Sequence, residues 1–463
     1  MEEPARNAQE KALHINLDAQ KIGTFAEIGA GQEVVRWFFH VGKASSTVAK
    51  SISAYSKEVS DGLYREATHY VSRERLKAML DAEFRQLAER LEGENRALFV
   101  FADTMATHGS SRDSEGHGWL GIRFQEKPGA EPSDVIIHIE MLDRFTIMRQ
   151  EAVGLVGVNL VYGAFTQYHD PSALLIGLMD GLDRRRVEID MIQFAGPLFR
   201  DVDHRLMSLE LVEQGFTEAT MFLASGEVVQ PSEILHGRRV LIERGSFRPV
   251  TNVMLDMLNG AAQELGLKQA AKVDEPVVLM EMTLKNLTSE EKIDHQDFVA
   301  RAELLGALHK TVLISSYQRF DGVTSYLRQY TDNRIGMVAG VPTLRAIFDE
   351  QYYEEFEGGL LGGLGRLFQG TVKLLVYPTL AGSGEIETAE NLQFDSKRQH
   401  LYEYLRENGS IEPIRAYDAS QLGKSPASVL DMIQAGDPAW KKYVPTEAAE
   451  LIEHQKLFGL PAR

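Results

Sequence analysis

Residues 239–252 read R-V-L-I-E-R-G-S-F-R-P-V-T-N. The apolar run at 240–243 suits a short buried strand, and Thr251 is a residue type that caps the start of a helix. The loop between them contains one glycine and two arginines. A buried strand that passes through a short loop into a helix is the unit from which α/β sheets are built. This stretch therefore predicts an α/β fold.

Apolar runs of the same kind recur along the chain, and helical patterns lie between most of them. The runs are residues 155–162, 187–194, 219–223, 240–243, 277–281, 312–316, 335–339 and 372–377. Strands that are apolar on both faces and alternate with helices predict a mostly parallel, doubly wound sheet. The same number of strands also allows a (β/α)8-like barrel. The hairpin pattern at 219–230, which turns at Ser225-Gly226, favours the open sheet.

The flanking segments have different patterns. Residues 72–91 predict an amphipathic helix, and strand patterns at 97–102, 119–125 and 134–142 predict a small antiparallel meander. After Pro378 the chain becomes polar and helical. The expected domains are a mobile arm at 1–20, an α+β domain at 21–150, an α/β parallel-sheet domain at 151–385 and a helical C-terminal extension at 386–463.

The composition limits the classes of function. Of the 463 residues, 44% are hydrophobic and 25% are charged, which is typical of a globular protein with a large core. The formal net charge of −18 disfavours binding to nucleic acid or to an anionic membrane surface. The lack of cysteine excludes disulfides and thiolate chemistry. Because the N-terminus is acidic and no apolar run is long enough to cross a bilayer, we expect a cytoplasmic protein.

A glycine-containing turn follows the strand pattern near residue 28. The segment G-A-G-Q-E-V at 29–34 resembles the start of a dinucleotide fingerprint, but Val34 stands where the third glycine belongs. Glu33 in the first helical turn repels a pyrophosphate. We therefore interpret this segment as a tight turn.

The arginine-containing loop is the best candidate for a ligand site. In open α/β sheets, ligands bind beyond the carboxyl ends of the strands, where helix N-termini present backbone amides to anions. Arginine offers a planar fork that suits phosphate or carboxylate. The residues that we assign to this site are Arg244, Gly245, Ser246, Arg248, Thr251, Lys285 and Asn286. The alternative interpretation is that the arginines pair with neighbouring acids and only close a surface loop.

Side chains suited to acid–base chemistry also follow the predicted strands. We assign this role to Glu188, Asp190, His204 and Glu281. Glu188 and Asp190 are two residues apart on one strand and face the same side, so with Glu281 they offer oxygen ligands for Mg²⁺. Alternatively, the carboxylates pair with arginines and His204 is polar packing. The chain contains no Walker A motif, G-x-S-x-G elbow or H-E-x-x-H motif.

Four segments resemble a family of bacterial proteins. They are F-A-E-I-G-A-G-Q-E-V at 25–34, H-G-W-L-G-I-R-F-Q at 117–125, G-V-N-L-V-Y-G-A-F at 157–165 and E-R-G-S-F-R-P-V-T at 243–251. Similar sequences are labelled nicotinate-nucleotide adenylyltransferase or TonB-dependent receptor. The first label implies an H-x-G-H turn that holds nucleotide phosphates. This chain lacks that turn, so the resemblance implies no catalytic residue here.

Two functional hypotheses follow. The first is a cytosolic protein, of transferase type if it is catalytic, that binds a phosphorylated or otherwise anionic small molecule such as a nucleotide at the carboxyl edge of its sheet. The second is a non-catalytic scaffold that self-associates into a homo-oligomer through its two terminal segments. The sequence does not decide whether the protein is an enzyme, and it indicates no cofactor beyond the candidate Mg²⁺.

Overall fold

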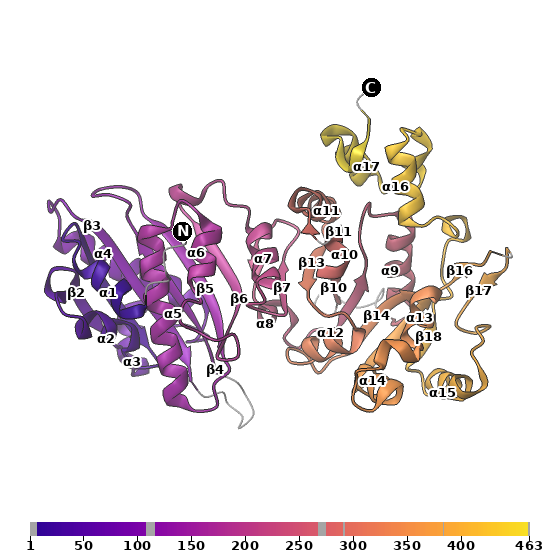
Figure 1. The fold of residues 1–463 in the computed structure, drawn as a ribbon, viewed down its shortest axis with the longest axis horizontal. Helices are drawn as coiled ribbons and strands as arrows, with labels where there is room; N and C mark the ends of the chain where they lie inside the picture. Colours follow the sequence, from indigo (N-terminus) through magenta and orange to yellow (C-terminus); the bar gives the residue numbers. More distant parts are fainter. Residues whose placement is uncertain (1–6, 108–115, 267–274, 290–291, 383, 462–463) are drawn as a thin grey trace. The chain divides into compact units, whose positions relative to one another are not determined.

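The computed structural model describes residues 7–107, 116–266, 275–289, 292–382 and 384–461 (Figure 1). The chain forms two compact units, Met1–Glu218 and Ala219–Arg463. Each unit has its own sheet and its own hydrophobic core.

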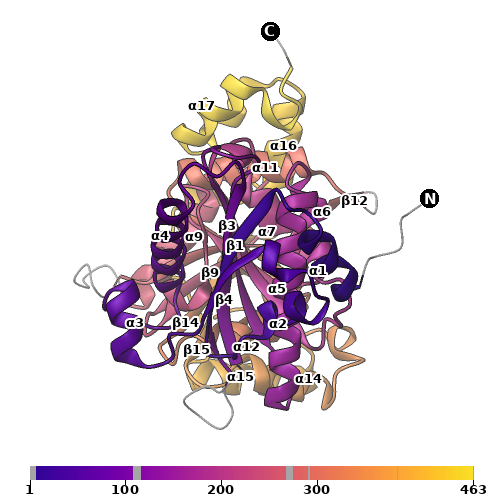
Figure 2. The same ribbon diagram turned by 90° about the vertical axis from the view of Figure 1, so that its left-hand side faces the viewer.

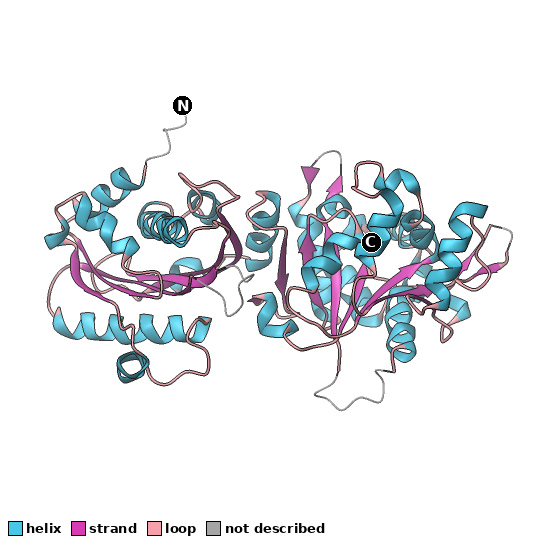
Figure 3. Ribbon diagram, turned by 90° about the horizontal axis from the view of Figure 1, so that it is seen from below, coloured by secondary structure: helices cyan, strands magenta, loops and turns pink. Residues whose placement is uncertain are grey.

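The first unit is built on a six-stranded sheet of order β2-β1-β3-β4-β5-β6. The strands are β1 (Lys21–Ile28), β2 (Val48–Ile52), β3 (Ala97–Ala106), β4 (Gly116–Phe124), β5 (Ser133–Met141) and β6 (Val187–Ala195). The helices are α1 (Ala8–Asn16), α2 (Glu33–His40), α3 (Lys57–Tyr64), α4 (Arg73–Arg90), α5 (Thr146–Thr166), α6 (Pro171–Gly177) and α7 (His204–Glu213). β1 pairs in parallel with β2 and β3, and β3 to β6 form an antiparallel meander. Helices cover both faces of this sheet (Figure 2 and Figure 3).

The core of the first unit lies where α2 and α5 pack on the sheet. Phe25, Phe101 and Leu120 from three neighbouring strands are fully buried there. α5 approaches α2 closely because Gly157 has no side chain, and a Cβ at this position would lie 2.3 Å from a methyl carbon of Val34. The apolar runs of the sequence thus form a core between a sheet and a helical layer.

The turn between β1 and α2 is tight, as predicted. Gly29 has a φ of +105°, and a Cβ there would lie 1.9 Å from the carbonyl oxygen of Met105, so only glycine fits. The carboxylate of Glu27, on β1, accepts hydrogen bonds from the backbone N–H groups of Val34 and Val35 at 2.9 and 3.0 Å. The chain's own carboxylate therefore occupies amides at which a nucleotide phosphate would bind.

The structure differs from three expectations in this unit. Residues 155–162 lie within helix α5 and not in a strand, because this 21-residue helix is buried and apolar on most sides. The expected mobile arm contains α1, whose Ala12 and Ile15 are fully buried. The expected boundary near residue 150 lies instead after Glu218, because β6 pairs antiparallel with β5 and so completes the first sheet.

The second unit is built on an eight-stranded sheet of order β18-β15-β14-β9-β10-β13-β7-β8. The strands are β7 (Ala219–Phe222), β8 (Val228–Val229), β9 (Val240–Arg244), β10 (Val277–Thr283), β13 (Thr311–Ser315), β14 (Ile335–Gly340), β15 (Val372–Tyr377) and β18 (Ile411–Pro413). Two small hairpins are β11 (Thr288–Ser289) with β12 (Lys292–Ile293) and β16 (Thr379–Leu380) with β17 (Ile386–Glu387). The helices are α8 (Pro231–Leu235), α9 (Asn252–Glu264), α10 (Leu284–Leu287), α11 (His295–Ala307), α12 (Phe320–Leu327), α13 (Val341–Ile347), α14 (Gly359–Leu367), α15 (Ser396–Glu407), α16 (Pro426–Gln434) and α17 (Thr446–Gln455).

The parallel strands of the second unit follow the order of a dinucleotide-binding sheet. Counted along the chain from β9, the strands β9, β10, β13, β14, β15 and β18 lie in the order 3-2-1-4-5-6, and all of these neighbours pair in parallel. This is the Rossmann order, whose topological switch point here lies between β9 and β14. The predicted doubly wound α/β fold is confirmed, and the sheet is open rather than closed into the (β/α)8-like alternative.

Two details of the second unit concern its edges. The predicted hairpin at 219–230 is present, since β7 pairs antiparallel with β8. The C-terminal segment is mainly helical, as expected, but β18 within it joins the sheet beside β15. The segment is therefore partly integrated into the fold of the second unit.

Candidate functional site

Arg244 ends β9 and forms a buried ion pair. Its Nε and Nη2 donate to the two carboxylate oxygens of Glu281 on β10 at 2.8 and 2.7 Å, and its side chain is 10% exposed. Glu281 is fully buried and also accepts a hydrogen bond from the hydroxyl of Ser315. The guanidinium of Arg244 lies over the ring of Phe320, 4.4 Å from its centre. Arg244 and Glu281 thus satisfy each other, and the predicted ligand-binding role of Arg244 is replaced by the alternative, ion pairing.

Arg248 shares one carboxylate with a second arginine. Its Nε lies 2.6 Å from Oδ1 of Asp297, and the Nη2 of Arg301 pairs with the other oxygen of the same carboxylate. Arg301 is 4% exposed and also donates to the carbonyl oxygens of Ser246 and Asn286, at 3.0 and 2.9 Å. The side chain of Arg248 is 36% exposed. Asp294 also acts electrostatically on Arg301, so two carboxylates lie near the two guanidinium groups. Arg248 is the more accessible of the two arginines.

The loop after β9 and helix α10, which follows β10, are joined at this arginine pair. Arg301 bridges them, since one of its carbonyl partners is in the loop and the other is in α10. Lys285 is exposed and precedes one of those partners in the chain. The ring of Phe247 lies 3.1 Å from the position that a Cβ on Gly245 would take, so one side of Gly245 is packed against its own loop.

The N-terminus of α9 is covered by a distant part of the chain. The backbone N–H of Asn252 donates to the carbonyl oxygen of Tyr443 at 2.8 Å, and its side-chain amide donates to that of Lys442 at 3.1 Å. Thr251 is 1% exposed. In a Rossmann sheet this helix follows the first strand and normally holds a phosphate. Here two carbonyl groups of the C-terminal segment take that place, so Thr251 does not present an open anion site.

The predicted acid–base residues do not form one cluster. Glu188, Asp190 and His204 belong to the first unit, whereas Glu281 belongs to the second. The strands that carry the carboxylates belong to two different sheets, because β6 joins the antiparallel meander of the first unit. The Nε2 of His204 lies 2.8 Å from the carbonyl oxygen of Phe194, so His204 fastens its helix to β6, as the polar-packing alternative expects.

Asp190 takes part in a chain of hydrogen bonds that the sequence did not predict. Its Oδ1 lies 2.6 Å from Nδ1 of His138, and Nε2 of His138 lies 3.2 Å from Nδ1 of His117. Burial and the neighbouring His138 lower the pKa of His117 to about 4. Burial raises the pKa of Glu188, which accepts from the hydroxyl of Thr217, to about 7.

Three further carboxyl groups are buried without a cationic partner in hydrogen-bonding contact. Burial, opposed by hydrogen bonds from two backbone amides, raises the pKa of Glu27 to about 7. Burial and the charge of Glu27 raise the pKa of Asp103, which lies opposite Glu27 on β3. Burial also raises the pKa of Glu243, on β9. A raised pKa keeps a carboxyl group protonated to higher pH, and a carboxyl group offers no positive charge to an anion.

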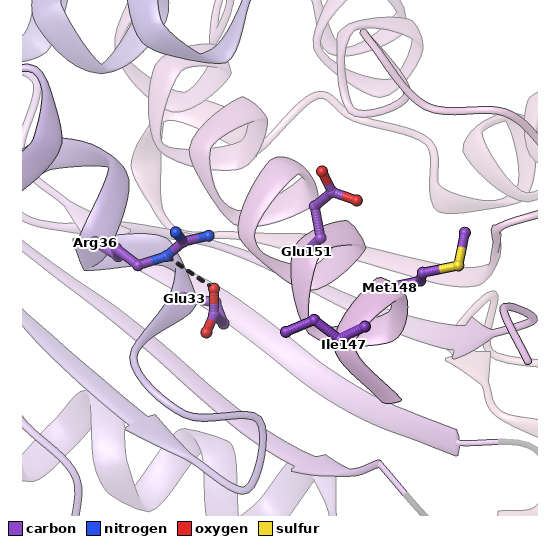
Figure 4. Close-up of a pocket in the computed structure, with 5 residues that line it drawn as sticks. All are labelled: Glu33, Arg36, Ile147, Met148 and Glu151. Carbon is purple, nitrogen blue, oxygen red and sulfur yellow. Dashed lines mark hydrogen bonds and ion pairs between the residues drawn. The ribbon is translucent and has the colours of Figure 1, made fainter. Parts of the chain in front are cut away.

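A surface hollow of about 360 Å³ lies between α2 and α5 in the first unit (Figure 4). Its lining residues are Glu33, Arg36, Ile147, Met148 and Glu151. Glu33 pairs with Arg36 at 3.0 Å, and Glu151 pairs with Arg186 at 3.0 Å. The lining thus contains two carboxylates and one guanidinium, and the partner of Glu151 lies outside the lining.

The described residues also bear on metal binding and on membrane spanning. Within the described ranges, no three histidine, aspartate or glutamate side chains are placed to hold a metal ion together. The candidate Mg²⁺ ligands Glu188, Asp190 and Glu281 therefore form no such group. Among the same residues, no helix is long and apolar enough to cross a membrane.

The sequence interpretation missed Asp297, Arg301 and His138. Asp297 and Arg301 are spaced i,i+4 on α11, which is a detectable signal for a helical ion pair. Nothing in that spacing shows that Arg248 shares the carboxylate. His138 faces the same side of a predicted strand as Asp134 and Ile136. Its partner Asp190 is 52 residues away in the chain.

No protein-family model matches the sequence, and no curated protein matches it. Among solved structures, the chain is similar to the competence/damage inducible protein CihA from Agrobacterium tumefaciens, with 15% identity and a TM-score of 0.26 over 35% of this chain and 97% of that chain. It is also similar to a competence-damaged protein (CinA) superfamily protein from Enterobacter cloacae, with 10% identity and a TM-score of 0.27 over 35% of this chain and 95% of that chain. A similarity at this level says nothing about activity.

Proposed function

We propose that the second unit binds a phosphorylated small molecule at the carboxyl edge of β9 and β10, and that Arg248 is its principal contact. The observation that carries this proposal is the carboxylate of Asp297, which is shared by Arg248 and Arg301. Arg248 is the exposed arginine of this cluster, and its guanidinium is free to take a phosphate oxygen on its accessible side. Lys285 lies exposed on the adjoining short helix α10.

The position of the cluster supports the same conclusion. Ligands of Rossmann sheets bind outside the carboxyl ends of the strands. β9 and β10 are the first two parallel strands of the second unit along the chain, and they are neighbours in the sheet. The backbone amide of Asn252 at the start of α9 donates to the carbonyl oxygen of Tyr443, and the Asn252 side chain donates to that of Lys442. We therefore assign the anion to the side chains of the loop after β9 and of α10, and not to the start of α9. Binding, rather than a transferase reaction, is the function that this geometry supports.

The test is a thermal-shift screen of the full chain with inorganic pyrophosphate, nucleotides and phosphorylated sugars. A compound at about 100 times its Kd adds roughly 2.7 kcal/mol of stability. Arg248→Ala should raise the Kd by about 10- to 100-fold, because one hydrogen bond to a charged group is lost. The protein should still fold, since the Arg301–Asp297 pair stays intact.

Arg345→Ala is the matched control. Arg345 is an exposed arginine of the same unit that pairs with Glu387, so its loss changes the net charge equally. This variant should keep the full thermal shift. The proposal is wrong if no phosphorylated compound stabilises the protein, or if Arg248→Ala and Arg345→Ala weaken binding equally.

A further inference from the structure

Three side chains from neighbouring strands of the first unit form a continuous line of hydrogen bonds. Asp190 on β6 bonds Nδ1 of His138 on β5, and Nε2 of His138 bonds Nδ1 of His117 on β4, at 2.6 and 3.2 Å. A β-bulge creates this alignment. His138 is paired with Met191 and Ile139 with Ile189, so Asp190 is the extra residue between them. Bulges re-aim side chains and are over-represented beside active sites.

The burial of the inner pair fixes where its proton lies. His138 and Asp190 are 2% and 3% exposed. A carboxylate only accepts hydrogen bonds, so Nδ1 of His138 carries a proton and Nε2 is left to face His117. His117 then donates its own Nδ1–H to that nitrogen, and the lone pair of its Nε2 points away from the line. His117 is only partly buried, and its outer nitrogen ends the line.

Proton uptake at the outer nitrogen moves a charge along the line. When Nε2 of His117 accepts a proton, its Nδ1 proton passes to Nε2 of His138, and the positive charge comes to rest beside the carboxylate of Asp190. A buried carboxylate stabilises a cation next to it. The orienting carboxylate and the imidazole follow the logic of a catalytic triad, with a second imidazole at the outer position.

We propose that the first unit has an acid–base site in which His117 is the catalytic residue, with His138 and Asp190 as positioning residues. Its substrate presents a protic group, water or a hydroxyl, that loses a proton to Nε2 of His117 as its oxygen adds to an electrophilic carbon. The site is independent of the anion site proposed for the second unit.

Other charged groups lie near the line. Glu140 is the cross-strand neighbour of His117 on β5, and Glu188 is the cross-strand neighbour of Glu140 on β6. Arg73, at the start of α4, lies over the ring of Trp119, and Trp119 contacts the ring of His138. Because the pKa of His117 is lowered to about 4 by burial and by His138, we expect its ring to be neutral at pH 7. It is then able to accept a proton.

The experiment measures hydrolysis of p-nitrophenyl acetate by the full chain between pH 3 and 9, a range that includes the lowered pKa of His117. In this reaction a water oxygen adds to the acetyl carbon while His117 takes the water proton, and the ester C–O bond breaks to release p-nitrophenolate and acetate. His117→Gln should lower the protein-dependent rate about 100-fold or more, the range of general acid–base catalysis. Asp190→Asn should lower the rate and also shift its pH profile, which loss of folding alone would not do.

His400→Gln is the control, because His400 is an 85% exposed histidine of the second unit. It should leave the rate unchanged. A rate that is unchanged in His117→Gln, or that falls equally in His400→Gln, would overturn the proposal. A ¹⁵N titration of the unaltered protein tests it without any substitution. A lowered pKa of His117 is expected, and titration of its ring at the ordinary histidine pKa of about 6.5 would contradict the proposal.

Discussion

Glu27 and Asp103 show what burial does to paired acids in the first unit. They lie opposite each other on the parallel strands β1 and β3, and both are fully buried. Oδ2 of Asp103 is buried with no hydrogen-bond partner. Two carboxyl groups in this arrangement cannot both be ionised without a large cost. The folded state therefore favours their protonated forms.

This pair predicts a stability that decreases with rising pH. The pKa of Glu27 is raised from 4.5 to about 7 by burial, so the folded state binds a proton more tightly than the unfolded state. The resulting stabilisation is fully present below pH 4.5 and is lost as the pH rises through 7. Asp103→Asn should flatten the pH dependence of the free energy of unfolding between pH 5 and 8, and should stabilise the protein at pH 8 by roughly 1–3 kcal/mol.

Urea unfolding at several pH values checks this prediction. Asn is close in shape to Asp, and its side-chain oxygen can still accept the backbone N–H of Ile28, which Asp103 binds at 3.0 Å. The variant should therefore match the original protein at pH 5. An unchanged slope of stability against pH would show that the pair is not the source of the effect.

Gly157 on α5 lies at the contact between α2 and α5. A Cβ at Gly157 would lie 2.3 Å from one methyl carbon of Val34 and 3.1 Å from the ring of Phe101, and all three residues are buried. Gly157→Ala should therefore destabilise the protein by about 1–3 kcal/mol, the usual cost of overpacking a core, despite the better helix propensity of alanine.

Gly365 in α14 is the matched comparison. A Cβ at this position would have no heavy atom within 4 Å. Gly365→Ala should stabilise the protein by up to about 1 kcal/mol, because only the propensity term remains. Thermal unfolding of both variants, followed by circular dichroism, is the measurement. Equal effects of the two substitutions would mean that the contact between α2 and α5 is looser than the structure shows.

At the scale of the whole molecule, the chain divides into two units with separate sheets. Met1–Glu218 and Ala219–Arg463 each contain a complete core. Both lengths lie within the usual range for independent domains. The two halves, expressed separately, should each be soluble and unfold cooperatively by circular dichroism. A half that lacks a sigmoidal thermal transition would show that its core depends on the other half.

Much of the architecture is predictable from local patterns. The apolar runs at 240–243, 277–281, 312–316, 335–339 and 372–377 all form strands of the second unit. Ser72 accepts the backbone N–H of Arg75 and so caps α4, as its sequence pattern indicates. The turn at Gly29 requires glycine for a local steric reason. The run at 155–162 was misinterpreted because a fully buried helix and a buried strand are both apolar throughout.

The sequence by itself determined the α/β class, the parallel strands and the location of a cation-containing loop, because period, capping and turn chemistry act over a few residues. Only the tertiary structure decided which sheet β6 joins, that Asp297 serves both Arg248 and Arg301, and that Asp190 aligns with two histidines. Those contacts depend on strand order and register, and on packing between distant segments. Such pairings are set by the packing of segments that are distant in the sequence, and no local residue pattern predicts them.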